Sequence, residues 1–200
     1  REAVFAGTRK SFLSGHVVVG LSADFAVEAH LMVPETYANN LYTYLLNFQI
    51  KTPEATQQYE QSRPLPEDDL YLYADPDWHH PDYPDGLAIF DPLHNAAIIL
   101  GLRYFGELKK GTLTLAWATA HRNGFVACHG GMKQYQRQDG TFTMAAFGLS
   151  GSGKSTITLT SHGDRYPVKV LHDDAFVIDR QTGATTALEP AYFDKTQDYP

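Results

Sequence analysis

One stretch decides how this chain can be organised: Phe147-Gly148-Leu149-Ser150-Gly151-Ser152-Gly153-Lys154-Ser155-Thr156. It fits the pattern G-x-x-x-x-G-K-[ST] of a phosphate-binding loop, running from Gly148 to Ser155. Its glycines allow the tight turn that points successive backbone N–H groups at the oxygens of a polyphosphate. Lys154 would then reach the β- and γ-phosphates, and the Ser155 hydroxyl would bind Mg²⁺. The stretch predicts a site for the phosphates of a nucleotide.

The residues on either side support this interpretation. Residues 141–147 have the composition of a buried strand entering the loop, and residues 155–159 that of a short helix leaving it. A strand, loop and helix in this order place the helix N-terminus beneath the bound anion. A glycine-serine surface turn that happens to end in Lys-Ser is the alternative, and the strand directly upstream disfavours it.

Composition limits the class of protein. The chain has 200 residues, of which 43% are hydrophobic and 20% charged, as in one globular domain or one lobe of a larger protein. A net charge of −7 gives no attraction for nucleic acid or an anionic membrane, and no apolar run has the length of a bilayer span. We therefore expect neither as a partner. The single cysteine, Cys128, is typical of a reducing compartment and predicts a cytoplasmic protein.

The order of predicted elements indicates an α/β fold. Strands are expected within residues 16–33, 70–74, 87–90, 95–100 and 124–129, helices over 34–50 and 112–120, a connecting segment over 51–68 and a hairpin over 177–186. Residues 168–174 form a predicted buried strand with Asp173 and Asp174 at its end. An apolar strand that ends in a carboxylate is typical of the second nucleotide motif, which manages Mg²⁺.

Taken together, these pieces resemble the ATP-dependent phosphoenolpyruvate carboxykinase family. Four blocks carry the resemblance in the family's order: Tyr104-Phe105-Gly106-Glu107-Leu108-Lys109-Lys110-Gly111, Ala127-Cys128-His129, residues 147–156, and Leu171-His172-Asp173-Asp174. A weaker fifth block spans residues 189–196, and the match is loose before residue 69. Phosphate loops are common, but the first block upstream of one is not.

The resemblance implies a fold and a reaction. The fold is α/β: a mixed-sheet, P-loop-containing nucleotide-binding lobe of the carboxykinase type (residues 101–200, truncated), with part of the N-terminal substrate-side lobe (residues 1–100). The reaction is reversible conversion of oxaloacetate and ATP to phosphoenolpyruvate, CO₂ and ADP. The implied partner is that small-molecule substrate, and the implied cofactors are ATP, Mg²⁺ and Mn²⁺.

The resemblance also implies roles for individual residues. Lys110, His129 and Asp174 would bind Mn²⁺, with Ser155 on the Mg²⁺ side, and Lys110 can ligate only as the free amine. Lys109 would steady phosphate or enolate, Tyr104 would contact substrate or CO₂, and Asp173 would orient Mg²⁺ through water. The implied nucleotide contacts are Gly148, Leu149, Ser150, Gly151, Ser152, Gly153, Lys154, Ser155, Thr156 and Lys195.

Each of these residues also has a plainer interpretation. Lys109 and Lys110 could be solvated charges at a helix start, His129 a packed core histidine, and Asp173-Asp174 a strand-end turn. Their joint order favours the site.

The chain departs from the family where Gly130-Gly131 follows His129 and Ala175-Phe176-Val177 follows Asp174. The family's substrate-binding arginines have no counterpart, which predicts a fragment or a divergent relative, inactive as an isolated chain. The alternatives are a P-loop small-molecule or protein kinase and a non-catalytic ATP-binding relative.

Overall fold

The computed structural model describes residues 1–149 and 151–191. Its helices are α1 (Glu2–Gly7), α2 (Ala38–Asn47), α3 (Pro53–Glu60), α4 (Phe105–Arg122) and α5 (Lys154–Leu159), with 3₁₀ turns η1 (Glu35–Tyr37) and η2 (His162–Asp164). Its strands are β1 (Phe12–Ser22), β2 (Phe25–Pro34), β3 (Gln49–Ile50), β4 (Leu70–Asp75), β5 (Leu87–Asp91), β6 (Ala96–Leu100), β7 (Phe125–Arg137), β8 (Gly140–Phe147), β9 (Val168–Asp179) and β10 (Thr185–Ala187). The predicted α/β class is confirmed.

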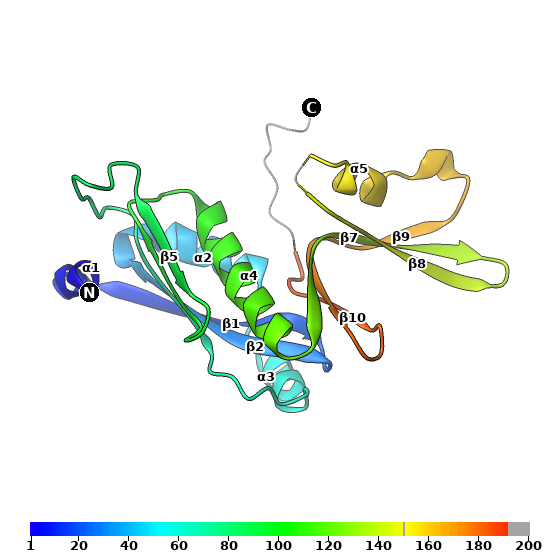
Figure 1. The fold of residues 1–200 in the computed structure, drawn as a ribbon, viewed down its shortest axis with the longest axis horizontal. Helices are drawn as coiled ribbons and strands as arrows, with labels where there is room; N and C mark the ends of the chain where they lie inside the picture. The colour runs from blue at the N-terminus through cyan, green and yellow to red at the C-terminus, as the bar shows by residue number, and fades with distance from the viewer. Residues whose placement is uncertain (150, 192–200) are drawn as a thin grey trace.

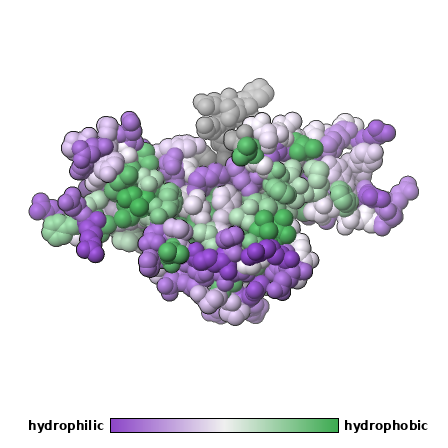
Figure 2. All heavy atoms as spheres, in the orientation of Figure 1, coloured by the Kyte–Doolittle hydropathy of each residue, from purple (hydrophilic) through white to green (hydrophobic). Residues whose placement is uncertain are grey.

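The first sheet is mixed and has the strand order β3-β1-β2-β4-β6-β5. β1 and β2 form a long antiparallel hairpin, whereas β4 runs parallel to both β2 and β6. β5 returns antiparallel to β6 and forms one edge, where Ile89 and Phe90 are 50% and 38% exposed. Figure 2 shows hydrophobic surface at the left of the molecule, where Figure 1 places β5. This sheet therefore presents an apolar edge.

The second sheet is antiparallel, with the order β10-β9-β7-β8. β7 pairs with β9 along most of its length, so Gly130 lies opposite Asp174 and Gly131 opposite Asp173. On its other side, β7 pairs with β8 up to Phe147, where the phosphate loop begins. This register brings the predicted metal residues and the loop to the same end of the sheet.

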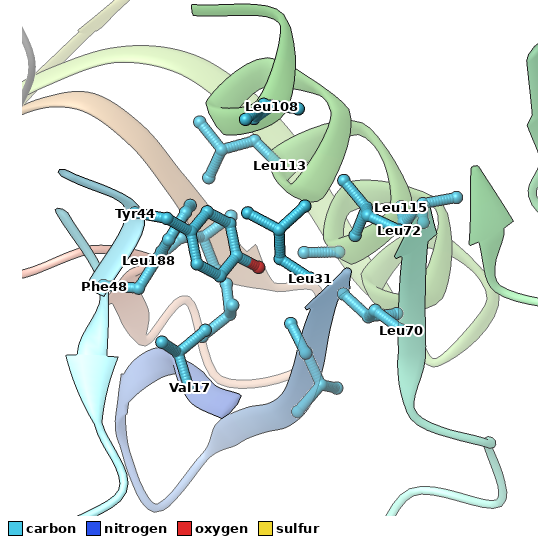
Figure 3. Packing of buried hydrophobic residues seen from close by; sticks show 14 of the residues in the cluster. Val17, Leu31, Tyr44, Phe48, Leu70, Leu72, Leu108, Leu113, Leu115 and Leu188 are labelled. Atoms are coloured by element: carbon cyan, nitrogen blue, oxygen red, sulfur yellow. The ribbon is translucent and has the colours of Figure 1, made fainter. Parts of the chain in front are cut away.

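One hydrophobic core connects both sheets. Figure 1 shows α4 running across the middle of the molecule between the first sheet and β7, and it packs on both. Figure 3 shows Leu113 of this helix in the same cluster as Val17, Leu31, Tyr44 and Leu188, all buried. Because the cluster draws on α2, α4 and both sheets, the side chains of α4 that face the second sheet are held rigidly.

Three expectations from the sequence are wrong. Residues 51–68 contain α3, which begins where the Thr52 hydroxyl accepts a hydrogen bond from the N–H of Ala55 and Pro53 occupies the first turn. The strand at 141–147 is mostly exposed rather than buried, because β8 is the edge strand and its apolar residues lie on an uncovered ladder. Asp173 and Asp174 lie in the middle of β9, because the apolar run Ala175-Phe176-Val177 continues the strand to Asp179.

The helix predicted over residues 112–120 begins earlier, at Phe105. Lys109 and Lys110 therefore lie in its second turn rather than ahead of it. Leu108 and Leu113 anchor this part of the helix in the core. As a result, Lys109 is carried inward to 1% exposure, and Lys110 faces the second sheet.

Candidate active site

The phosphate loop connects β8 to α5, as the sequence predicts. Gly151 and Gly153 have φ angles of 76° and 84°, which residues with a side chain rarely adopt. Lys154 Nζ donates a hydrogen bond to the carbonyl oxygen of Leu149 at 2.8 Å, so this lysine folds back over its own loop. Ser150 and Lys195, two of the predicted nucleotide contacts, lie outside the described residues.

Asp174 is the centre of a compact charged cluster. Its Oδ2 lies 2.6 Å from Lys109 Nζ, and its Oδ1 lies 2.6 Å from Lys110 Nζ and 3.3 Å from His129 Nε2. Two ammonium groups and an imidazole thus surround one carboxylate, and three of the four residues are those predicted to bind Mn²⁺. Lys110 Nζ, His129 Nε2 and Asp174 Oδ1 converge from α4, β7 and β9.

The pKa shifts of His129 and Asp174 suit metal ligation. Burial lowers the pKa of His129, and the Lys110 ammonium lowers it further, so the ring is neutral near pH 7. Burial alone would raise the pKa of Asp174, but the Lys109 and Lys110 ammonium groups hold it below its usual value. A neutral imidazole and an ionised carboxylate are the forms that bind a divalent cation.

Two glycines of β7 allow close packing beside the loop, Gly131 against α5 and Gly130 against β8. A Cβ at Gly131 would lie 2.6 Å from Asp173 Oδ1 and 2.6 Å from the Thr158 side chain of α5. A Cβ at Gly130 would lie 1.9 Å from the carbonyl oxygen of Ala146 on β8. Gly130 and Gly131 therefore have a packing role beside the loop.

A hollow of about 330 Å³ joins the loop to the cluster. It is lined by His129, Gly130, Gly151, Gly153, Lys154, Ser155, Thr156, Asp173 and Asp174. Of the other predicted residues, Lys109 is buried behind Asp174, and Tyr104 precedes α4 with its ring against Gly106. The phosphate loop and both aspartates thus face one space large enough for phosphate groups.

Sequence reasoning missed the buried residues that support this site. Glu189 lies 3.1 Å from Lys109 Nζ, and Asn47 Nδ2 donates to its other oxygen at 2.5 Å.

Two further buried residues lie near the site. Burial lowers the pKa of His172 to about 4, and its Nε2 accepts the N–H of Ala175 at 2.8 Å. Lys133, fully buried on β7, donates to carbonyls at the end of α5. No signal in the sequence marked either Lys133 or Asn47, since Lys133 stands close to the polar residues Gln134 and Gln136 on β7.

A second group of possible ligands lies on the first sheet, away from the loop. Glu28, His30 and Asp69 place ligand atoms within 4.8 Å of one another. These side chains already have partners, since His30 Nε2 lies 2.8 Å from Asp69 and Lys51 Nζ lies 2.6 Å from Glu28. We assign no metal to this group.

Comparison with known families matches residues 4–197 to the family described as phosphoenolpyruvate carboxykinase. The chain belongs to that family. The resemblance noted from four sequence blocks is thereby confirmed, and the match extends through the first third of the chain, where those blocks gave little signal.

Curated relatives carry the same family name. A phosphoenolpyruvate carboxykinase (ATP) of Aeropyrum pernix is 35% identical over 127 residues, covering 60% of this chain and 26% of that protein. One of Dictyostelium discoideum is 41% identical over 61 residues, covering 30% of the chain and 10% of that protein. A glycosomal one of Trypanosoma brucei brucei is 39% identical over 61 residues, covering 30% and 12%. The chain thus aligns with about a quarter or less of each carboxykinase.

Among the described residues of this carboxykinase family member, no helix has both the length and the apolar character needed to cross a membrane.

Proposed function

We propose that this chain is part of an ATP-dependent phosphoenolpyruvate carboxykinase, which converts oxaloacetate and ATP to phosphoenolpyruvate, CO₂ and ADP. One observation carries the proposal: Asp174 is shared by Lys109, Lys110 and His129 beside the hollow that the phosphate loop also lines. Membership of the carboxykinase family supports the same reaction. A P-loop kinase is disfavoured because the family match spans residues 4–197.

Lys110, His129 and Asp174 would hold the transition metal, Mn²⁺ in this proposal. The donor set fits, since a neutral imidazole, a carboxylate and an amine are nitrogen and oxygen ligands that first-row divalent ions accept. When bound, the cation supplies Lewis-acid stabilisation of the charge that develops on oxaloacetate as CO₂ leaves. Lys110 must give up a proton to ligate, and the Asp174 oxygen it now contacts is then free for the metal.

The phosphate loop would hold ATP–Mg²⁺. Backbone N–H groups of the loop would surround the phosphates, Lys154 would exchange its Leu149 carbonyl for a phosphate oxygen, and Ser155 would hold Mg²⁺. Thr156 extends the loop contacts, and Ser150 and Lys195 remain proposed nucleotide contacts. Asp173 would orient Mg²⁺ through water from the same wall of the hollow.

Two residues would act on the transferred groups. Lys109 would steady phosphate or enolate charge once its ammonium, now 2.6 Å from Asp174 Oδ2, turns toward the hollow, and Tyr104 would contact substrate or CO₂ at the start of α4. We further propose that residues 1–100 belong to the substrate-side lobe and residues 101–200 to the nucleotide lobe, and that the compartment is cytoplasmic. We expect the isolated chain to be inactive.

The test is a coupled assay on the full-length protein with ATP, Mg²⁺, Mn²⁺ and oxaloacetate, following phosphoenolpyruvate and ADP. Formation of both, dependent on oxaloacetate, supports the carboxykinase reaction. ADP without phosphoenolpyruvate points to a kinase or ATPase, and neither product points to a non-catalytic ATP-binding relative.

A further inference from the structure

Glu189 is a fully buried carboxylate that none of the roles above uses. It follows β10, and its two oxygens have different partners. Oε1 lies 3.1 Å from Lys109 Nζ, and Oε2 accepts a hydrogen bond from Asn47 Nδ2 at 2.5 Å. Asn47, the last residue of α2, is itself 5% exposed. A buried chain therefore runs from α2 through Glu189 and Lys109 to Asp174.

The backbone beside Glu189 is fixed by both sheets. The N–H of Leu188 donates to the carbonyl oxygen of Ala175 on β9, and the carbonyl oxygen of Leu188 accepts the N–H of Gly20 on β1, each at 3.0 Å. The Leu188 side chain lies in the core with Tyr44 and Phe48, as Figure 3 shows. Because the backbone of Leu188 is held on both sides, the backbone of Glu189 has little freedom to move. Its carboxylate is fixed in turn by the hydrogen bond from Asn47.

The buried carboxylate of Glu189 depends on its charged and polar neighbours. Lys109 and Glu189 are both removed from water, and neither Lys109 Nζ nor Glu189 Oε1 has an aligned hydrogen bond among the described residues. Their ion pair compensates for burial together with the pair between Lys109 and Asp174 and the hydrogen bond from Asn47 to Glu189. Burial raises the pKa of Glu189 to about 7 even though Lys109 opposes the shift, so the fold accepts a cost that an apolar side chain would avoid. A group retained at such a cost is typical of a functional site.

We propose that Glu189 is a positioning residue: held by Asn47, it fixes the Lys109 ammonium against Asp174 Oδ2 and leaves Oδ1 directed at Lys110 and His129. The inference rests on the proposed carboxykinase function. Without Glu189, the Lys109 ammonium would rely on Asp174 alone and compete with a metal ion for that carboxylate. Helix α2, which packs on the first sheet, thereby helps to set the geometry of a site that lies on the second sheet.

The experiment compares three variants of the full-length protein. Glu189→Gln keeps the shape of the side chain and removes its charge, and Asn47→Ala removes the amide that holds it. Glu67→Gln is the matched control, because Glu67 forms a similar partly buried cluster with Arg122, Asn95 and Asn123 elsewhere. For each variant, kcat, the KM for ATP, the Mn²⁺ affinity without nucleotide (by electron paramagnetic resonance) and Tm are measured.

We expect Glu189→Gln to lower kcat by roughly tenfold or more while the KM for ATP changes by less than about twofold, because the loop is untouched. Mn²⁺ binding is expected to weaken by roughly threefold or more as Lys109 competes for Asp174. Asn47→Ala is expected to lower kcat and Mn²⁺ affinity too, each by a smaller factor than Glu189→Gln does. Glu67→Gln is expected to lower Tm and leave kcat unchanged, which separates positioning from simple loss of stability.

The proposal is overturned if kcat and Mn²⁺ affinity of Glu189→Gln both stay within about twofold of wild type. If Glu189→Gln does not fold, Asn47→Ala decides: a lower kcat supports positioning and an unchanged kcat overturns it. If the wild-type protein makes no phosphoenolpyruvate, the proposed function fails, and the Mn²⁺ titration alone still tests Glu189.

Discussion

Lys133 Nζ donates a hydrogen bond to the carbonyl oxygen of Ile157 at 2.7 Å, from β7 to the last turn of α5. The same ammonium donates to the carbonyl of Thr160 just beyond the helix. A helix leaves its last carbonyls without internal partners, and a cation there also favours the helix dipole. Lys133 therefore holds the far end of the helix whose near end forms the phosphate loop.

Replacing Lys133 should loosen that helix. Lys133→Met removes the charged donor to the carbonyls of Ile157 and Thr160, and a hydrogen bond from a charged group contributes about 1.5–3 kcal/mol. We expect a lower Tm and weaker ATP binding, measured by thermal unfolding and titration calorimetry. Lys169→Met is the control, since Lys169 is exposed on the neighbouring strand β9 and paired in register with Gln134. Equal Tm values for the two variants would contradict this role.

Lys154 is the charge that the phosphate loop offers to ATP. Lys154→Ala removes a charge-assisted contact worth on the order of 1.5–3 kcal/mol, so ATP–Mg²⁺ affinity should fall roughly tenfold to over a hundredfold. Titration of wild type, Lys154→Ala and Lys169→Ala with ATP–Mg²⁺ measures this. Superimposable binding curves for wild type and Lys154→Ala would contradict the proposal that this loop binds ATP.

Gly131 provides the space between α5 and Asp173. In Gly131→Ala the new methyl group meets Thr158 and Asp173 at 2.6 Å, so the helix or the carboxylate must move. We expect Tm to drop by an amount corresponding to about 1–3 kcal/mol, together with weaker ATP–Mg²⁺ binding. Adding Thr158→Ala should restore part of both, because it removes one of the two contacts. If neither Tm nor ATP–Mg²⁺ affinity recovers in the double variant, the clash with Asp173 alone accounts for the loss.

The pair between Glu67 and Arg122 gives a pH-dependent contribution to stability. A hydrogen bond from Arg122 lowers the pKa of Glu67 below its ordinary value of 4.5 in the folded state. The pair therefore stabilises the fold fully above pH 4.5, and this contribution is lost as the pH falls through the lower folded-state pKa. The Tm deficit of Glu67→Gln should be constant from about pH 6 to 8 and shrink below 4.5. A deficit that persists at the lowest pH would contradict an ionic origin.

What the sequence could predict was local. Gly151, Gly153 and Lys154 specify a loop by their own backbone and charge, and the apolar spacing of Leu41, Tyr44 and Phe48 predicted the helix α2 with its buried face. The start of α3 was also encoded, in Thr52 and Pro53, but the polar residues that follow obscured it.

What the sequence could not predict depends on distant partners. Asn47 and Glu189 are 142 positions apart, and no pattern near either residue indicates the other. The exposure of β8 was missed for the same reason, since whether an apolar strand is covered depends on its place in the sheet. The sequence predicted that Lys110, His129 and Asp174 converge only from the order of the blocks along the chain. Their distances depend on the register of β7 and β9, which the sequence does not reveal.

The hydrogen bond from Gly20 to Leu188 has a consequence for synthesis on the ribosome. The core around Val17 is completed by Leu188, so the first strands to be translated must wait for a residue made near the end of this chain. Contacts so distant in sequence slow folding, and β1 and β2 meanwhile carry apolar side chains in contact with water. A nascent chain halted before Leu188 is therefore a natural client for chaperones that bind exposed hydrophobic segments.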